Sequence, residues 1–187
     1  MDDIVKAAMA KWPNVPDCYG WLGLDARGRW WMRDDRAQRA GPFAGPLAQP
    51  QSRGAELKHA KLIDFIHRNY AADAQGRWFF QNGPQRVFVE LEVAPWVWRI
   101  EPDGQLVAHT GQPAQYETSW VDEAGRLYLA CDLGLGVVHT LDMDRAADAV
   151  AAGRWLPQEC LAQELPARYG FVLSPQATAE PSSPGGH

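Results

Sequence analysis

A five-residue turn motif, Asp-x-x-Gly-Arg, occurs three times in this 187-residue chain, beginning at Asp25, Asp73 and Asp122. In each copy the aspartate can accept backbone N–H groups at the start of a type I turn, and the glycine can adopt the left-handed conformation that closes a hairpin. An aromatic or aliphatic residue follows each motif and opens the outgoing strand. A calcium loop would need several oxygen ligands at close spacing, whereas each turn offers one or two. The repeat therefore predicts three hairpin turns and no metal site.

The strand that follows the second turn motif shows the clearest alternation in the chain. Over Arg86–Val93, valine and leucine occupy every second position, and arginine, phenylalanine and glutamate lie between them. Side chains of a strand point alternately to its two faces, so this pattern predicts a half-buried strand of an antiparallel sheet. The preceding Asn82-Gly83 pair is a strong hairpin signal, which predicts that the strand pairs with Trp78–Phe80.

Three segments have the periodicity of helices. They are Asp2–Lys11, Ala55–Tyr70 and Asp142–Ala152. In the second segment Ile63 and Ile66 share the apolar face, so we expect both side chains in the core.

Together these elements predict an α+β fold, built as a single compact unit from two similar motifs. Each motif is expected to be a curved antiparallel sheet of hairpins that packs a helix. The first motif is expected over residues 1–112 and a smaller one over residues 113–173, followed by a disordered tail at 174–187. Within the first motif, residues 34–54 are rich in proline and glycine and lack periodicity, which predicts an extended loop that is either mobile or a functional flap.

Composition excludes several classes of protein. The net charge is −5 and both signs are mixed along the chain, which argues against a nucleic-acid-binding protein with a basic patch. No apolar run is long enough to cross a membrane, and the first residues lack the pattern of a secretory leader. The three cysteines form no Cys-x-x-Cys motif, which is typical of a protein in a reducing compartment. We therefore expect a cytoplasmic monomer or homodimer that binds neither nucleic acid nor membranes.

Three stretches carry a resemblance to known families: KWPNVPDCYGWLGLDARGRWWMRD, LIDFIHRNY and GRWFFQNGPQRVFVELEVAPWVWRI. Over residues 11–110 the chain resembles an uncharacterised proteobacterial family of small cytoplasmic proteins, known only as a domain of unknown function. Its layout is also similar to a second uncharacterised bacterial family, in which curved antiparallel sheets each cradle a helix in repeated α+β motifs. A role in signal transduction has been suggested for that family. The resemblance implies a two-repeat α+β fold and names no ligand.

An enzyme would need a nucleophile, a base and an orienting group that converge. Two pairs of residues offer such chemistry, namely Cys131 with His139, and His109 beside Thr110. Neither pair lies in a motif such as Gly-x-Ser-x-Gly or His-Glu-x-x-His, and Cys131 continues an inward-facing strand pattern. We therefore assign no catalytic residue, no metal and no cofactor. A small hydrolase-like enzyme with an unrecognised site is the alternative to a binding protein.

The binding hypothesis rests on the nine tryptophans, most of which lie in or near the hairpins. Adjacent aromatic residues of a strand point to opposite faces, so one member of each pair either forms an exposed aromatic surface or fills a thin core on the far side. The residues expected on such a surface are Trp30, Trp31, Phe79, Gln81, Arg86, Phe88, Trp96 and Trp98. The sequence therefore predicts a non-enzymatic binding or regulatory module that recognises a protein, a peptide or a small ligand through an aromatic-rich sheet surface.

Overall fold

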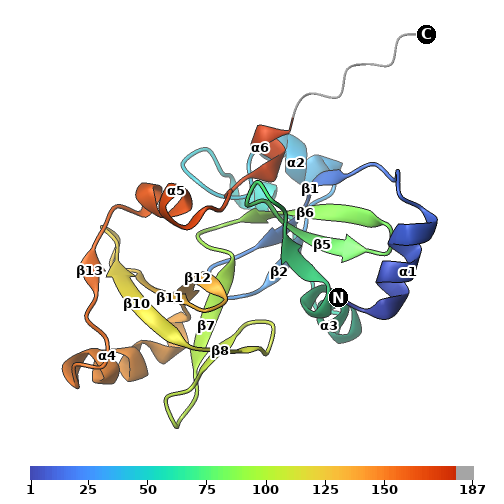
Figure 1. The fold of residues 1–187 in the computed structure, drawn as a ribbon. Helices are drawn as coiled ribbons and strands as arrows, with labels where there is room; N and C mark the ends of the chain where they lie inside the picture. Colours follow the sequence, from blue (N-terminus) through green and yellow to red (C-terminus); the bar gives the residue numbers. More distant parts are fainter. Residues whose placement is uncertain (180–187) are drawn as a thin grey trace.

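The computed structural model describes residues 1–179, in which two β-sheets lie side by side with helices packed around them (Figure 1). The first sheet has the strand order β3-β2-β1-β6-β5-β4, and the second has the order β13-β10-β11-β12-β7-β8-β9. The strands of the first sheet are β1 (Cys18–Leu24), β2 (Trp30–Met32), β3 (Ala55–Glu56), β4 (Tyr70–Ala72), β5 (Trp78–Asn82) and β6 (Gln85–Leu91). Those of the second are β7 (Trp96–Ile100), β8 (Leu106–Ala108), β9 (Pro113–Ala114), β10 (Tyr116–Val121), β11 (Leu127–Cys131), β12 (Gly134–Val138) and β13 (Gln158–Glu159). The predicted α+β class is confirmed.

Short helices connect and cover the sheets. The α-helices are α1 (Asp3–Lys11), α2 (Asp35–Ala40), α3 (Ala60–Arg68), α4 (Met143–Ala151), α5 (Leu165–Tyr169) and α6 (Pro175–Thr178). The 3-10 helices are η1 (Pro50–Arg53), η2 (Thr140–Asp142) and η3 (Ala162–Glu164). Among residues 1–179 no helix has the length and apolar character needed to cross a membrane.

Both sheets are mixed rather than purely antiparallel. The three turn motifs join the antiparallel pairs β1–β2, β4–β5 and β10–β11, and β5 pairs with β6 as the Asn-Gly signal predicted. Three parallel pairs link segments that are far apart in the sequence: β1 with β6, β7 with β12, and β10 with β13. The alternation within one strand does not reveal the direction of its neighbour, which is why the sequence alone predicted antiparallel sheets.

The chain crosses from the first sheet to the second between Leu91 and Trp96. Strand β7 belongs to the second sheet, where it pairs in parallel with β12. In this pair Trp98 lies opposite Val138. Gly136 on β12 makes room for this pairing, since a Cβ atom there would overlap the indole of Trp98. Strands β7 and β8, which the sequence-based division placed in residues 1–112, therefore lie in the second sheet.

One hydrophobic core joins the two sheets. It contains buried side chains from the first sheet, such as Leu24 and Val89, and from the second, such as Val97 and Tyr128. Ile66 of α3 belongs to the same core and is 1% exposed, as predicted. A second core lies on the other face of the second sheet, where α4 covers it. The shared core makes the two sheets a single compact unit.

Helix α3 is shorter than its periodicity predicted. It begins at Ala60 rather than Ala55, because Ala55 and Glu56 pair with β2 as strand β3. The side chain of His59 then caps the helix by accepting a hydrogen bond from the Leu62 N–H. Ile63, which we expected in the core, is only half-buried at its edge.

The three turn motifs have the same backbone geometry. Gly28, Gly76 and Gly125 have φ angles of 76°, 76° and 77°, in the left-handed region. In each turn the aspartate Oδ1 accepts the backbone N–H groups two and four residues ahead, at 2.8–3.0 Å. The predicted hairpin turns are confirmed, and every aspartate is used by its own turn.

The proline- and glycine-rich segment 34–54 is not the extended loop that its composition predicted. It contains α2 and η1, and it is anchored on the guanidinium group of Arg33, which is 1% exposed. This group donates hydrogen bonds to the carbonyl oxygens of Ser52 at 2.7 Å, Gly20 at 3.0 Å and Gly41 at 2.6 Å. Arginine satisfies several carbonyls at once because its five N–H donors are held in one plane, so a segment without periodicity can still be well packed.

The C-terminal segment returns from the second sheet to the first, through α5 to α6 (Figure 1). Val172 N donates to Gly76 O at 2.9 Å, and Leu91 N donates to Leu173 O at 2.8 Å. The buried Glu90 carboxylate then accepts hydrogen bonds from Ser174 Oγ and Gln176 N at 2.5 and 2.9 Å. The start of the predicted disordered tail is therefore held by the first sheet, and residues 180–187 of that tail lie outside the described residues.

Candidate functional site

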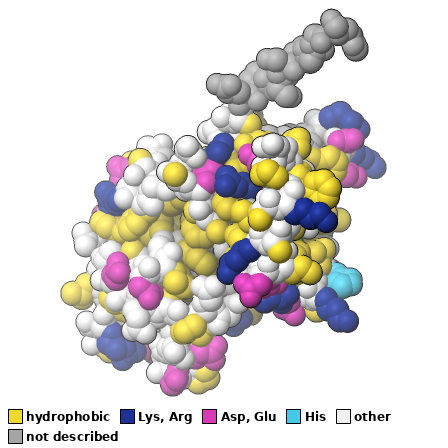
Figure 2. Space-filling model, turned by 45° about the vertical axis from the view of Figure 1, so that its right-hand side comes forward, with side chains coloured by type: hydrophobic (Ala, Val, Ile, Leu, Met, Phe, Trp, Pro, Cys, Tyr) yellow, Lys and Arg dark blue, Asp and Glu magenta, His cyan; other side chains and the backbone are white. Residues whose placement is uncertain are grey.

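Six of the eight residues predicted to form an aromatic surface are buried. Their side chains are at most 5% exposed: Trp30, Phe79, Gln81, Phe88, Trp96 and Trp98. Trp31 and Arg86 are half-buried. The buried residues cannot reach a partner in this conformation, so the aromatic surface is corrected to a core. On the face shown in Figure 2, surface hydrophobic side chains are interrupted by Lys and Arg side chains.

Arginine side chains explain why the second aromatic face is covered. Phe79 does point away from its neighbour Trp78, because Phe79 packs on Phe88 whereas Trp78 packs on a different set of rings. The guanidinium carbon of Arg86 lies 5.0 Å from the centre of the Phe79 ring, and that of Arg77 lies 4.7 Å from the Phe88 ring. Long arginine stems can cover apolar rings while their charged ends stay in water.

Cys131, His139 and His109 have structural roles, whereas the Thr110 hydroxyl and His109 Nε2 are buried without a hydrogen-bond partner among the described residues. Cys131 is buried, and burial raises the pKa of its thiol to about 12, so the thiol stays protonated. His139 Nδ1 accepts the Leu141 N–H at the start of η2. His109 Nδ1 accepts the Val97 N–H at 3.2 Å, and burial lowers the pKa of His109 to about 3. The protonated thiol of Cys131 does not suit a nucleophile, and a pKa of about 3 makes His109 a weak base near neutral pH.

A cleft opens where the two sheets meet the C-terminal segment. Its volume is about 690 Å³, within the range of pockets that bind small molecules. Its lining comes from three parts of the chain: residues 43–53, the sheet junction with β11, and the C-terminal segment. The lining residues are Phe43, Ala44, Gly45, Ala48, Gln49, Pro50, Arg53, Glu92, Val93, Arg126, Tyr128, Ala162, Gln163 and Leu173. We call this the junction cleft.

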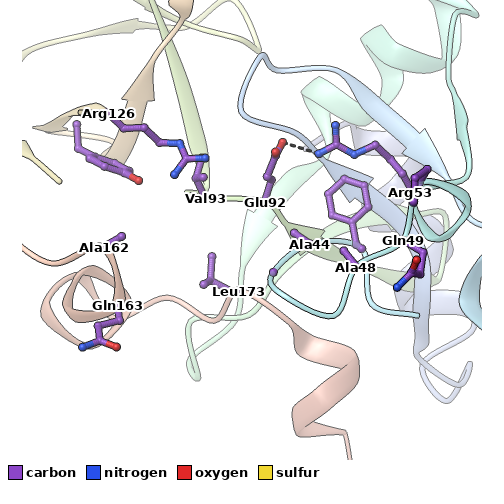
Figure 3. A pocket seen from close by; sticks show the side chains of 14 residues that line it. Ala44, Ala48, Gln49, Arg53, Glu92, Val93, Arg126, Ala162, Gln163 and Leu173 are labelled. Carbon is purple, nitrogen blue, oxygen red and sulfur yellow. Dashed lines mark ion pairs between the residues drawn. The ribbon is translucent and has the colours of Figure 1, made fainter. Parts of the chain in front are cut away.

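Arg53 enters the junction cleft from the side of the first sheet (Figure 3). Its guanidinium carbon lies 5.2 Å from the Trp31 ring centre and 5.3 Å from the Phe43 ring centre. One terminal nitrogen forms an ion pair with Glu92 Oε2 at 2.8 Å, and the same oxygen accepts the Ala26 N–H at 2.7 Å. Among residues 1–179 the other N–H groups of Arg53, a residue that lines the cleft, have no hydrogen-bond acceptor.

Arg126 enters from the opposite side, where Figure 3 shows its guanidinium group directed towards Val93 and Glu92. Arg126 is the last residue of the third turn motif, yet it differs from its two equivalents. Arg29 and Arg77 each donate through Nε to the aspartate of their own turn at 2.7 Å. The nearest guanidinium nitrogen of Arg126 is 3.8 Å from Asp122 Oδ2, which is beyond hydrogen-bond distance. Within residues 1–179 the guanidinium group of Arg126 donates no hydrogen bond, and its side chain is 45% exposed.

The lining of the cleft contains more positive than negative side chains, although the Asp122 carboxylate lies 3.8 Å from Arg126. Two arginines and one glutamate line it, whereas the whole chain carries a net charge of −5. Ala48, Val93 and Leu173 give the cleft an apolar wall beside these charges.

Residues 1–176 match the model of the family DUF2944, which is described as a protein of unknown function (DUF2946). The chain belongs to this family. The predicted membership of an uncharacterised family is thereby confirmed. The DUF2944 chain is similar to a DUF1285 family protein from Silicibacter pomeroyi DSS-3, with 14% identity and a TM-score of 0.47 over 79% of this chain and 84% of that chain. A DUF1285 family protein from Shewanella baltica OS155 has 14% identity and a TM-score of 0.43 over 68% of this chain and 91% of that chain. No curated protein matches the DUF2944 chain.

Sequence reasoning missed the two arginines of the junction cleft in this DUF2944 chain. Arg53 stands at the end of a segment interpreted as a loop, and only the tertiary structure places it in the same cleft as Arg126. Arg126 was recognised only as part of a turn motif. A signal was nevertheless present, because the third motif alone is followed two residues later by a tyrosine, Tyr128, where the others have Trp31 and Phe79.

Proposed function

We propose that the protein is a ligand-binding module whose junction cleft binds a small organic anion. The observation that supports this proposal is that Arg53, at the end of η1, and Arg126, in the turn between β10 and β11, line one cleft with guanidinium N–H groups that donate no hydrogen bond within residues 1–179, apart from the ion pair of Arg53 with Glu92. Guanidinium groups bind carboxylates and phosphates through paired, charge-assisted hydrogen bonds. The apolar wall favours an anion that also carries an apolar body. Of the residues first predicted for binding, Trp31 contributes by supporting Arg53.

The charges of the cleft set the expected strength of binding. Glu92 already neutralises part of Arg53 at 2.8 Å, whereas Arg126 forms only a looser ion pair with Asp122 at 3.8 Å, so Arg126 is the more available of the two charges. A hydrogen bond to a charged group contributes about 1.5–3 kcal/mol, and removing the charge should weaken binding about tenfold or more. Because Arg126 is partly exposed, the affinity should fall as the salt concentration rises.

The test uses two probes that share a ring and differ in their anionic group, benzoate and phenyl phosphate. Isothermal titration calorimetry measures their affinity, and NMR follows the Nε–Hε signal of Arg126. We expect at least one probe to bind and to shift this signal, and Arg126→Gln to weaken its binding about tenfold or more. The preferred probe tells whether the site takes a carboxylate or a phosphate ester.

Arg77→Gln is the matched control, because Arg77 holds the equivalent turn position and lies outside the cleft lining. It should retain the affinity of the wild-type protein. If neither probe shifts the signals of cleft residues at millimolar concentration, or if Arg77→Gln loses as much affinity as Arg126→Gln, the proposed function is wrong.

A further inference from the structure

The aspartate of each turn motif is buried, so its outer oxygen Oδ2 needs a hydrogen-bond donor. Side-chain exposure is 1% for Asp25, 6% for Asp73 and 0% for Asp122. In the first two turns the arginine of the motif is that donor, with its Nε 2.7 Å from Oδ2. In the third turn the donor is the hydroxyl group of Tyr128, at 3.0 Å from Asp122 Oδ2.

Tyr128 is well suited to hold Asp122 permanently. Its side chain is buried in the core that joins the two sheets, where its ring cannot move away. Burial and the neighbouring Asp122 carboxylate both raise the pKa of Tyr128, so the hydroxyl remains a donor at any physiological pH. The Asp122 carboxylate is therefore satisfied without Arg126.

A second difference separates Arg126 from the other turn arginines. The guanidinium group of Arg29 lies 5.5 Å from the centre of the Trp31 ring, and that of Arg77 lies 4.7 Å from the centre of the Phe88 ring. Among the described residues no aromatic ring supports Arg126 in this way. In the first turn the Trp31 indole also donates to Asp25 Oδ2, at 3.0 Å, but it shares that oxygen with Arg29. Arg126 thus lacks both of the contacts that fix its equivalents.

We infer that Tyr128 is a positioning residue for the junction cleft: by satisfying Asp122, it leaves Arg126 free to receive the anionic group of the ligand. This inference rests on the proposed function and adds the reason why one arginine of three serves the cleft. It predicts that the hydroxyl group matters through Asp122 rather than by touching the ligand.

The experiment first removes the hydroxyl group of Tyr128 and then the negative charge of Asp122, to which this hydroxyl donates. Tyr128→Phe keeps the buried ring and leaves Asp122 Oδ2 without its donor, so Arg126 should close on Asp122 as Arg29 closes on Asp25. We expect benzoate or phenyl phosphate, whichever the wild-type protein binds, to bind about tenfold more weakly. The NMR signal of Arg126 Nε–Hε should also shift in the ligand-free variant.

Adding Asp122→Asn to Tyr128→Phe should rescue binding. Asparagine keeps the Oδ1 acceptor of the turn but lacks the charge that would capture Arg126, so the affinity should return to within about threefold of the wild-type value. Melting temperatures confirm that both variants are folded. If Tyr128→Phe binds like the wild type, or if the folded double variant does not recover, the positioning role is wrong while the proposed function stands. If the wild type binds neither probe, the proposed function itself fails.

Discussion

Alanine at Gly76 is expected to lower the free energy of unfolding by about 2–5 kcal/mol, whereas alanine at Gly125 should lower it by only about 1–2 kcal/mol. The two glycines occupy equivalent turns with φ angles of 76° and 77°, so the cost of a left-handed alanine is the same. They differ in their surroundings. A Cβ atom at Gly76 would overlap the carbonyl oxygen of Gly170 in the C-terminal segment, whereas a Cβ atom at Gly125 has no neighbour within 4 Å among the described residues.

Urea denaturation of the two variants measures this difference directly, because the cost of placing alanine in the left-handed conformation is the same in both and cancels in the comparison. Gly28→Ala provides an intermediate case, since its Cβ atom would lie 2.9 Å from the Cβ atom of His109. Equal losses at Gly76 and Gly125 would show that the C-terminal segment does not press on the second turn.

Acidification from pH 7 to pH 5 is expected to cost the folded protein about 2 kcal/mol through His109 alone. Burial lowers the pKa of His109 to about 3 in the folded protein, and the positive charge of a protonated His67 would lower it further. In the unfolded chain the pKa of histidine is about 6.5. Above about pH 6.5 the histidine is neutral in both the folded and the unfolded protein, so its titration does not change the free energy of unfolding. Below this pH the unfolded chain binds a proton that the folded protein excludes, so stability falls steadily as the pH approaches 3.

His109→Asn is the matched variant for this pH dependence. An asparagine oxygen can replace the imidazole Nδ1 that accepts the Val97 N–H, and it does not titrate. Chemical denaturation at several pH values measures the free energy of unfolding as a function of pH. The slope of this dependence should be shallower for the variant by the equivalent of about one proton. His67 contributes a smaller effect of the same sign, because burial also lowers its pKa. The comparison stops at pH 5, since burial raises the pKa of Glu90 and this carboxyl opposes the trend at lower pH. Identical slopes for the wild type and the variant would contradict the prediction.

Local chemistry made part of the fold predictable from the sequence. An aspartate that accepts its own backbone N–H groups, followed by a left-handed glycine, specifies a hairpin whatever surrounds it, and all three turns formed. The apolar face of α3 was likewise specified by spacing alone, at least for Ile66. The opposite orientations of Trp78 and Phe79 also followed from strand geometry.

Contacts between distant segments account for what the sequence could not reveal. Parallel pairing of β1 with β6 leaves no mark on either strand, because direction depends on the path between them. The burial of Phe79 involves contacts that strand alternation does not describe, such as the Arg86 side chain that lies over its ring. The same limit applies to the junction cleft, which Arg53 and Arg126 line together only after both sheets have packed.

The return of residues 171–176 to the first sheet sets the order in which the protein can be completed during synthesis. Strands β1 to β6 leave the ribosome long before Val172 and Leu173, which supply partners to Gly76 and Leu91. Until then the buried Glu90 also lacks the donors from Ser174 and Gln176. Domains usually fold as they emerge, N-terminal part first. Here the N-terminal half has to wait for residues 171–176, so native structure in both halves should appear together, once this segment has left the ribosome.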